Sequence, residues 1–129
     1  MQIIPYEEKH IAAVKKFNER MLAAQTELFF TFPEVAQSSE LAKAENSRIY
    51  QQYYLAVEDD NVHGGYILKQ QPAQKLNNEI TVGNYQLPLS EGIITPRFAM
   101  VGVQIYLDAI RKQKYLYSLG MGNQNRPLP

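Results

Sequence analysis

The stretch Ile93–Gln104, which reads IITPRFAMVGVQ, joins a segment of alternating apolar residues to an amphipathic segment. Upstream, the alternation restarts after a phase shift at Gly83-Asn84 and predicts a strand. The residues placed on one face of this strand are Tyr85, Leu87, Leu89, Glu91 and Ile93. Pro88 within the strand predicts a bulge or a missing ladder hydrogen bond, because proline lacks the backbone N–H donor.

Downstream of the same stretch, apolar residues recur at helical spacing and predict a helix over 101–112. Residues 115–119 then read as a last strand. A strand–helix–strand unit is expected to form a right-handed parallel crossover. The N-terminus of its helix then lies at the first corner of the crossover, which is a place suited to hold phosphate.

A hairpin is predicted before this unit. Its strands are residues 53–57 and 62–70, and the acidic turn 58–61 has residues that tolerate a left-handed backbone. Gly64-Gly65 is expected to mark a bulge or a close backbone approach. Pro72 is expected to end the second strand of the hairpin.

The first part of the chain predicts a short strand over 2–5, an amphipathic helix to about residue 25 and a second helix beginning at Ser38 or Ser39. Between these helices, Phe29, Phe30 and Phe32 are expected to pack a loop onto the core. The alternative is that they form the wall of a substrate pocket.

Composition excludes several classes of protein. The 129 residues suit a single domain, and thirteen basic residues balance thirteen acidic ones, which argues against an electrostatic hold on nucleic acid or an anionic membrane. The chain has no cysteine, no recognisable signal peptide and no apolar run long enough to span a membrane, so we expect a cytoplasmic domain. No metal site is expected, since His10 and His63 are far apart in sequence.

The order of these elements resembles the GNAT acetyltransferase fold up to its fifth strand. Pro96, Phe98 and Gly102 match the family's motif at this point, and Gly65 of the hairpin lies near its customary glycine. The resemblance implies an α/β (α+β) fold: one domain over 1–129, with a mixed sheet of about five strands and three helices. The family usually continues with a fourth helix and two strands, so we expect this chain to be a piece of a longer protein.

The resemblance also implies a site for acetyl-CoA. Ile93 and Ile94 would offer backbone groups to the pantetheine arm, or would simply be sheet core. Backbone N–H groups of the following loop would hold the pyrophosphate, and either Asn123 or Asn125 would match an asparagine that often follows the last strand. The loop residues are Ala99, Met100, Val101, Gly102, Val103 and Gln104. Ala99 and Gln104 depart from the family's pattern, which has arginine or glutamine at the first position and a small residue at the second.

Glu91 is the candidate general base. Its apolar neighbours on the strand are expected to raise its pKa by desolvation, and the alternative is a carboxylate that is solvated or paired with Arg97. His63 is expected to be a solvent-facing turn residue.

The leading functional prediction is transfer of an acetyl group from acetyl-CoA to an unknown amine. The rival prediction is a non-catalytic GNAT-like module for assembly or ligand sensing that has lost cofactor binding. A third possibility is a binding domain that shares only the order of elements. A second copy of the chain is expected to cover the open edge of the sheet.

Overall fold

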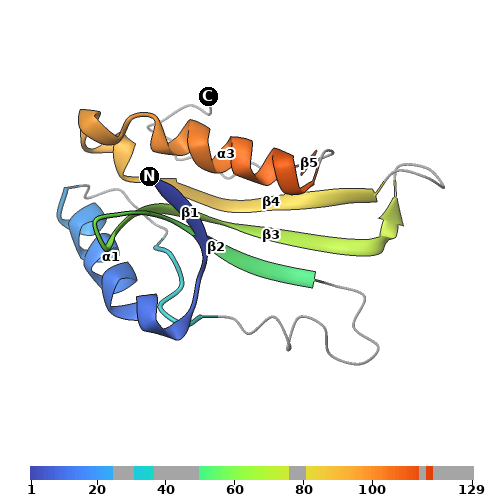
Figure 1. Ribbon diagram of the computed structural model, residues 1–129, viewed down its shortest axis with the longest axis horizontal. Helices are drawn as coiled ribbons and strands as arrows, with labels where there is room; N and C mark the ends of the chain where they lie inside the picture. Colours follow the sequence, from blue (N-terminus) through green and yellow to red (C-terminus); the bar gives the residue numbers. More distant parts are fainter. Residues whose placement is uncertain (25–30, 37–49, 76–80, 114–115, 118–129) are drawn as a thin grey trace.

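A computed structural model of the chain describes residues 1–24, 31–36, 50–75, 81–113 and 116–117. The elements in chain order are β1 (Gln2–Pro5), η1 (Glu8–His10), α1 (Ile11–Ala24), β2 (Tyr50–Glu58), β3 (Asn61–Lys75), β4 (Thr81–Ser90), η2 (Glu91–Ile93), η3 (Pro96–Phe98), α3 (Val101–Lys112) and β5 (Leu116–Tyr117), where η denotes a short 3₁₀ helix. The strands form one sheet in the order β1-β2-β3-β4-β5. Helix α1 covers one face of the sheet and α3 covers the other (Figure 1).

The strand pairing agrees with the predicted topology. Strands β1 to β4 pair with their neighbours in antiparallel fashion, whereas β5 runs parallel to β4. The parallel pair is joined by α3, so the predicted strand–helix–strand crossover is confirmed. Helix α3 has the predicted bounds, because its apolar residues recur every three or four positions and bury Val101, Ile105 and Ala109.

The predicted hairpin is also confirmed. Asp59 and Asp60 form the turn between β2 and β3, with φ angles of 51° and 65°, and the side-chain amide of Asn61 donates to the Asp59 carbonyl at 3.1 Å. Two central residues with positive φ match the twist of the flanking strands. The prediction that Pro72 ends β3 is wrong. This strand continues to Lys75, and the proline lies in a stretch where the register with β4 shifts, between Gln70 and Lys75.

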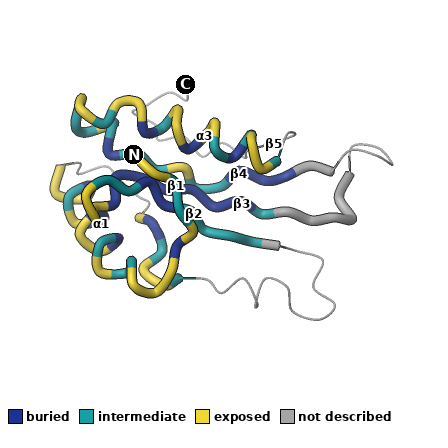
Figure 2. The backbone as a smooth tube through the Cα atoms, in the orientation of Figure 1, coloured by how far each residue is buried: buried dark blue, intermediate teal, exposed yellow. Residues whose placement is uncertain are grey.

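The sheet separates two hydrophobic clusters. The α1 cluster consists of Tyr6, Val14, Phe17, Met21, Phe32, Leu55, Val62 and Ile67. The α3 cluster consists of Ala56, Tyr66, Leu68, Tyr85, Val101, Ile105 and Ala109. Because side chains alternate along a strand, β2 and β3 contribute to both clusters. The first half of β3, residues 62–68, is the longest buried run among the described residues (Figure 2).

Strand β4 contains the bulge that Pro88 predicted. Leu87 has a φ of 47°, and the register with β3 shifts between the pairs Ile67–Gln86 and Gly65–Leu89. The extra residue reverses the alternation, since Tyr85 belongs to the α3 cluster while Leu87 and Leu89 pack against the α1 cluster. The prediction that these three side chains share one face is therefore wrong, and the strand ends at Ser90 rather than at Ile93.

Phe32 confirms the packing prediction for the aromatic loop. Its ring is buried and lies 6.0 Å from the ring of Tyr6, and its backbone exchanges hydrogen bonds with the side chain of Asn18 on α1. Phe29, Phe30 and the predicted second helix lie outside the described residues.

Candidate functional site

The corner between β4 and α3 is a compact double turn. The hydroxyl of Ser90 accepts the N–H of Gly92 at 3.0 Å, and the carbonyl of Glu91 accepts the N–H groups of Ile94 and Thr95. A Cβ on Gly92 would lie 2.4 Å from the carbonyl oxygen of Phe98, so η2 and η3 approach each other as closely as backbones can. This packing fixes Glu91 at the end of the sheet.

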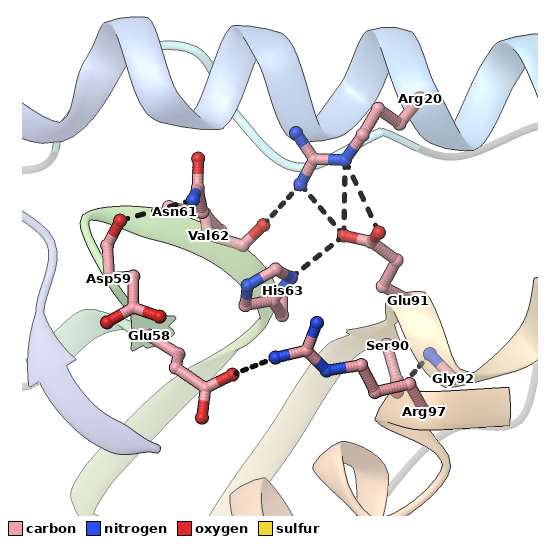
Figure 3. Close-up of polar contacts among 10 residues, drawn as sticks. All are labelled: Arg20, Glu58, Asp59, Asn61, Val62, His63, Ser90, Glu91, Gly92 and Arg97. Carbon is pink, nitrogen blue, oxygen red and sulfur yellow. Dashed lines mark hydrogen bonds and ion pairs between the residues drawn. The ribbon is translucent and has the colours of Figure 1, made fainter. Parts of the chain in front are cut away.

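Glu91 is buried and paired, with 5% of its surface exposed. Arg20 of α1 donates to it from both Nη2, at 2.8 Å, and Nε, at 3.3 Å from each carboxylate oxygen. The same Nη2 also donates to the carbonyl of Val62 at 2.7 Å (Figure 3). The alternative of a solvated glutamate or a pair with Arg97 is wrong, since Arg97 lies 3.7 Å from Glu58 instead.

The pKa of Glu91 is lowered, whereas the sequence predicted a raised pKa. Burial of the carboxyl group raises its pKa, but the hydrogen bonds from Arg20 and His63 outweigh burial and hold the pKa below its usual value. The carboxylate is therefore ionised at neutral pH. The role of Glu91 as a base stays a prediction.

His63 completes the cluster and is not a solvent-facing turn residue. Its Nδ1 lies 3.1 Å from Oε1 of Glu91, and its ring stacks on Phe98 with centroids 3.9 Å apart and planes 18° apart. Ala56 pairs with Gly64 and Val57 with Val62, so His63 is the additional residue of a β-bulge in β3. This bulge and the close approach of Gly64 to the carbonyl of Leu89 confirm the prediction made from the glycine pair.

The residues predicted to contact the cofactor occupy the corner and the first turn of α3. Ile93 ends η2 with 51% of its surface exposed, so it is not sheet core, whereas Ile94 packs against the α1 cluster. Ala99 and Met100 are exposed just before the helix. Asn123 and Asn125 lie outside the described residues.

The N-terminus of α3 has no side-chain cap. The first N–H groups of a helix have no partner within the helix, and here Gln104 is the first residue of α3 to donate to a backbone carbonyl, that of Met100 at 3.0 Å. Val101 is buried, while Val103 and Gln104 are exposed. A Cβ on Gly102 would meet only the side chain of Ser90, at 3.8 Å, so packing among the described residues does not require glycine there.

Two other features are absent from the described residues. No group of three or more histidine, cysteine or acidic side chains in this part of the chain could hold a metal ion. Among the same residues, no helix combines the length and the apolar character needed to cross a bilayer.

Comparison with known proteins rests on structure. No protein-family model matches the chain, and no curated protein matches its sequence. An acetyltransferase from Trypanosoma brucei covers 93% of this chain and 82% of its own length, with 12% sequence identity and a TM-score of 0.55. The fold is that of the GNAT acetyltransferases.

Two further GNAT structures match to a similar extent. A ribosomal-protein-alanine N-acetyltransferase from Brucella melitensis covers 94% of this chain and 81% of its own, with 12% identity and a TM-score of 0.51. A protein from Clostridium acetobutylicum, described as a predicted acetyltransferase and solved with acetyl-CoA, covers 92% of this chain and 80% of its own, with the same identity and TM-score. At such identities the likeness is one of GNAT fold.

Arg20 and His63 are the members of the Glu91 cluster that sequence reasoning missed. Arg20 lies on the predicted first helix, but its partner Glu91 is 71 residues away in the chain, and no local pattern links them. For His63 a signal was present, because it precedes a glycine pair that indicated a bulge, and a bulge re-aims the neighbouring side chain.

Proposed function

We propose that this chain binds acetyl-CoA at the corner between β4 and α3 and supports transfer of the acetyl group to an amine. The observation that carries the proposal is the uncapped N-terminus of α3, which follows β4 through the short turns η2 and η3 in a GNAT-like fold. A helix N-terminus combines unpaired N–H donors with the positive end of the helix dipole, and both favour a pyrophosphate.

The residues of the corner fit such a ligand. Val101, Gly102 and Val103 would present backbone N–H groups to the pyrophosphate, and the missing side chain at Gly102 leaves room for close approach. Ala99 and Gln104 add no cation, so we expect affinity to be lower than with a charge-assisted contact by about 1–3 kcal/mol. The backbone of Ile93 and Ile94 would face the pantetheine arm.

When bound, acetyl-CoA supplies an acetyl thioester as the electrophile. The chain's own residues would orient the thioester against main-chain N–H groups, which stabilise the oxyanion of the transition state. Glu91, or a base that acts together with it, would take the proton of the attacking amine.

Calorimetric titration with acetyl-CoA tests this proposal. We expect saturable binding to the wild type and at least ~10-fold weaker binding to Gly102→Glu, because the new carboxylate repels the pyrophosphate. A glutamate in the first turn suits the helix dipole, so this variant keeps its fold. Leu107→Glu is the matched control, since it adds the same charge on an exposed position of the same helix.

A folded wild type that shows no binding at about millimolar acetyl-CoA would overturn the proposal and favour the rival, a non-catalytic GNAT-like module. The proposal also includes a cytoplasmic location, which the absence of cysteine suits, and a homodimer through the β5 edge. Light scattering on the purified chain tests the dimer, and a monomer mass would contradict it.

A further inference from the structure

The geometry assigns His63 as the general base of the proposed acetyl transfer, with Glu91 as the residue that positions it. The inference rests on the proposed function and deepens it, since it names the atom that accepts the amine proton. That atom is Nε2 of His63. Glu91, the candidate base suggested by its place in the chain, would act through the imidazole and not on the amine itself.

The tautomer of His63 follows from its partner. Glu91 is held as a carboxylate by Arg20, and an ionised carboxylate can only accept hydrogen bonds. The 3.1 Å contact between Oε1 and Nδ1 therefore requires the proton of the neutral imidazole to be on Nδ1. The lone pair is then on Nε2, which is the form a general base needs.

Nε2 of His63 is not fully buried. Within the described part of the chain it has no hydrogen-bond partner, and it is not among the fully buried polar atoms that lack one. The side chain as a whole is 10% exposed, so the imidazole is largely enclosed. Stacking on Phe98 and the hydrogen bond to Glu91 together fix the orientation of the ring.

The charged groups around the imidazole come from four elements. Glu91 of η2 and Arg20 of α1 form the ion pair beside Nδ1. Arg97 of η3 lies with its guanidinium carbon 5.4 Å from the centre of the Phe98 ring, and it pairs with Glu58 of β2. These four groups balance in charge, and among them only Glu91 contacts the imidazole.

The proposed step is balanced in atoms and charge. As the amine nitrogen forms a bond to the acetyl carbon, the carbon–sulfur bond breaks and Nε2 of His63 accepts a proton from the nitrogen. The leaving thiolate receives that proton from the imidazolium, directly or through a water molecule, which returns His63 to its neutral form. The products are the N-acetylated amine and free coenzyme A.

A spectroscopic test needs neither cofactor nor acceptor. The chain has two histidines, so the variant His10→Gln leaves His63 as the single imidazole. Glutamine at position 10 can still accept the N–H of Glu7 that His10 accepts. Long-range ¹H–¹⁵N spectra of this variant are expected to show the Nδ1–H tautomer, and a protonated Nε2 with a bare Nδ1 would overturn the inference.

A kinetic test uses His63→Gln with acetyl-CoA and a panel of primary amines that contains spermidine, L-lysine and an alanine-terminated peptide. We expect acetyl-CoA to bind this variant as it binds the wild type, while kcat/KM falls at least ~100-fold, the usual contribution of a general base. In Glu91→Gln, kcat is expected to fall while KM stays near the wild-type value, because the imidazole loses the carboxylate that orients it. Unchanged transfer by a folded His63→Gln variant would overturn the inference.

The inference and the proposed function fail in different ways. Loss of acetyl-CoA binding in the wild type contradicts the proposed function and leaves the tautomer measurement as the test of the Glu91–His63 pair. Should His63→Gln fail to fold, carbethoxylation of His63 by diethyl pyrocarbonate in the His10→Gln variant replaces it. Rapid modification that acetyl-CoA plus amine slows supports an accessible base, and a rate as slow as that of a fully buried imidazole contradicts it.

Discussion

Arg20 links three parts of the molecule through one guanidinium group. It extends from α1 to the carbonyl of Val62 at the start of β3 and to the carboxylate of Glu91 after β4. Each partner is buried, so each would lose a hydrogen bond without access to enough water to replace it. The group therefore ties the end of the sheet to the helix that covers it.

Replacing Arg20 by alanine is expected to lower the free energy of unfolding by about 2–3 kcal/mol, because it leaves the buried Glu91 carboxylate with no cation and only the hydrogen bond from His63. The cost is below that of a fully buried pair, since 37% of the Arg20 side chain is exposed. Urea unfolding measures the change. Lys16→Ala, an exposed position on the same helix, is the control, and equal losses in the two variants would contradict the prediction.

The ionisation of Glu91 also predicts a pH dependence. Its pKa in the folded chain lies below the ordinary value of 4.5, so the unfolded state takes up the proton first as the pH falls. The stabilisation is present above about pH 4.5 and is lost as the pH falls through the lower, folded pKa. In Glu91→Gln, the free energy of unfolding should fall less steeply between about pH 5 and pH 3. Glu19→Gln, at an exposed position, should keep the wild-type slope, and equal slopes in all three proteins would refute this.

Part of this site could be predicted from the sequence. A single glutamate among apolar strand residues pointed to a buried carboxylate, and that is how Glu91 lies. Its pKa was mispredicted because the cation that sets it comes from α1, and only the tertiary fold brings that helix to the end of β4. No periodic pattern in the sequence links ion-pair partners that lie so far apart in the chain.

At the scale of elements, the turn from β4 to α3 has two glycines with opposite roles. Gly92 is where η2 meets the backbone of Phe98, whereas a Cβ on Gly102 would make only an ordinary contact with the Ser90 side chain. Neither has a positive φ, so backbone conformation does not explain either glycine. Close contact explains the first, and approach of a ligand is the proposed explanation of the second.

Alanine substitutions separate these roles. Gly92→Ala is expected to destabilise the chain by about 1–3 kcal/mol, because backbone atoms on both sides must move. Gly102→Ala is expected to leave the free energy of unfolding unchanged or to raise it by up to about 1 kcal/mol, since alanine restricts the unfolded chain. Thermal unfolding of the two variants tests this, and a larger loss for Gly102→Ala would reverse the assignment.

The bulge of β4 shows why the two faces of this strand could not be assigned from the sequence. Pro88 marked the strand as irregular, but the reversal of faces occurs at Leu87, which adopts a left-handed backbone despite its bulky side chain. Alternation of apolar residues continues through the bulge, so the pattern alone assigned Tyr85 and Leu89 to the same face. The register with β3 decides the faces, and register is a tertiary property.

At the scale of the whole molecule, the order and direction of the strands followed from sequence more reliably than the site did. Hairpin turns and crossover helices leave few ways to connect a sheet, so the predicted sequence of elements led to the observed GNAT-like arrangement. The contacts among α1, β3 and the turn after β4 depend on side chains that meet only in that arrangement.

The β2–β3 hairpin contributes residues to both hydrophobic clusters, one on each face of the sheet. Leu55 and Ile67 contribute to the cluster under α1, while Ala56 and Tyr66 contribute to the cluster under α3. Both helices pack on this hairpin, and the hairpin itself is closed by a local turn of two residues.

The hairpin is therefore expected to be the earliest structured part of the folding chain and the last to open. In native-state hydrogen exchange, the amides of Leu55 and Tyr66 should be the most protected, and those of α3 should exchange through smaller openings. Protection in α3 that outlasts protection in β2 and β3 would contradict this order. If the hairpin does form first, the short acidic turn at Asp59 and Asp60 is the point from which the whole molecule assembles.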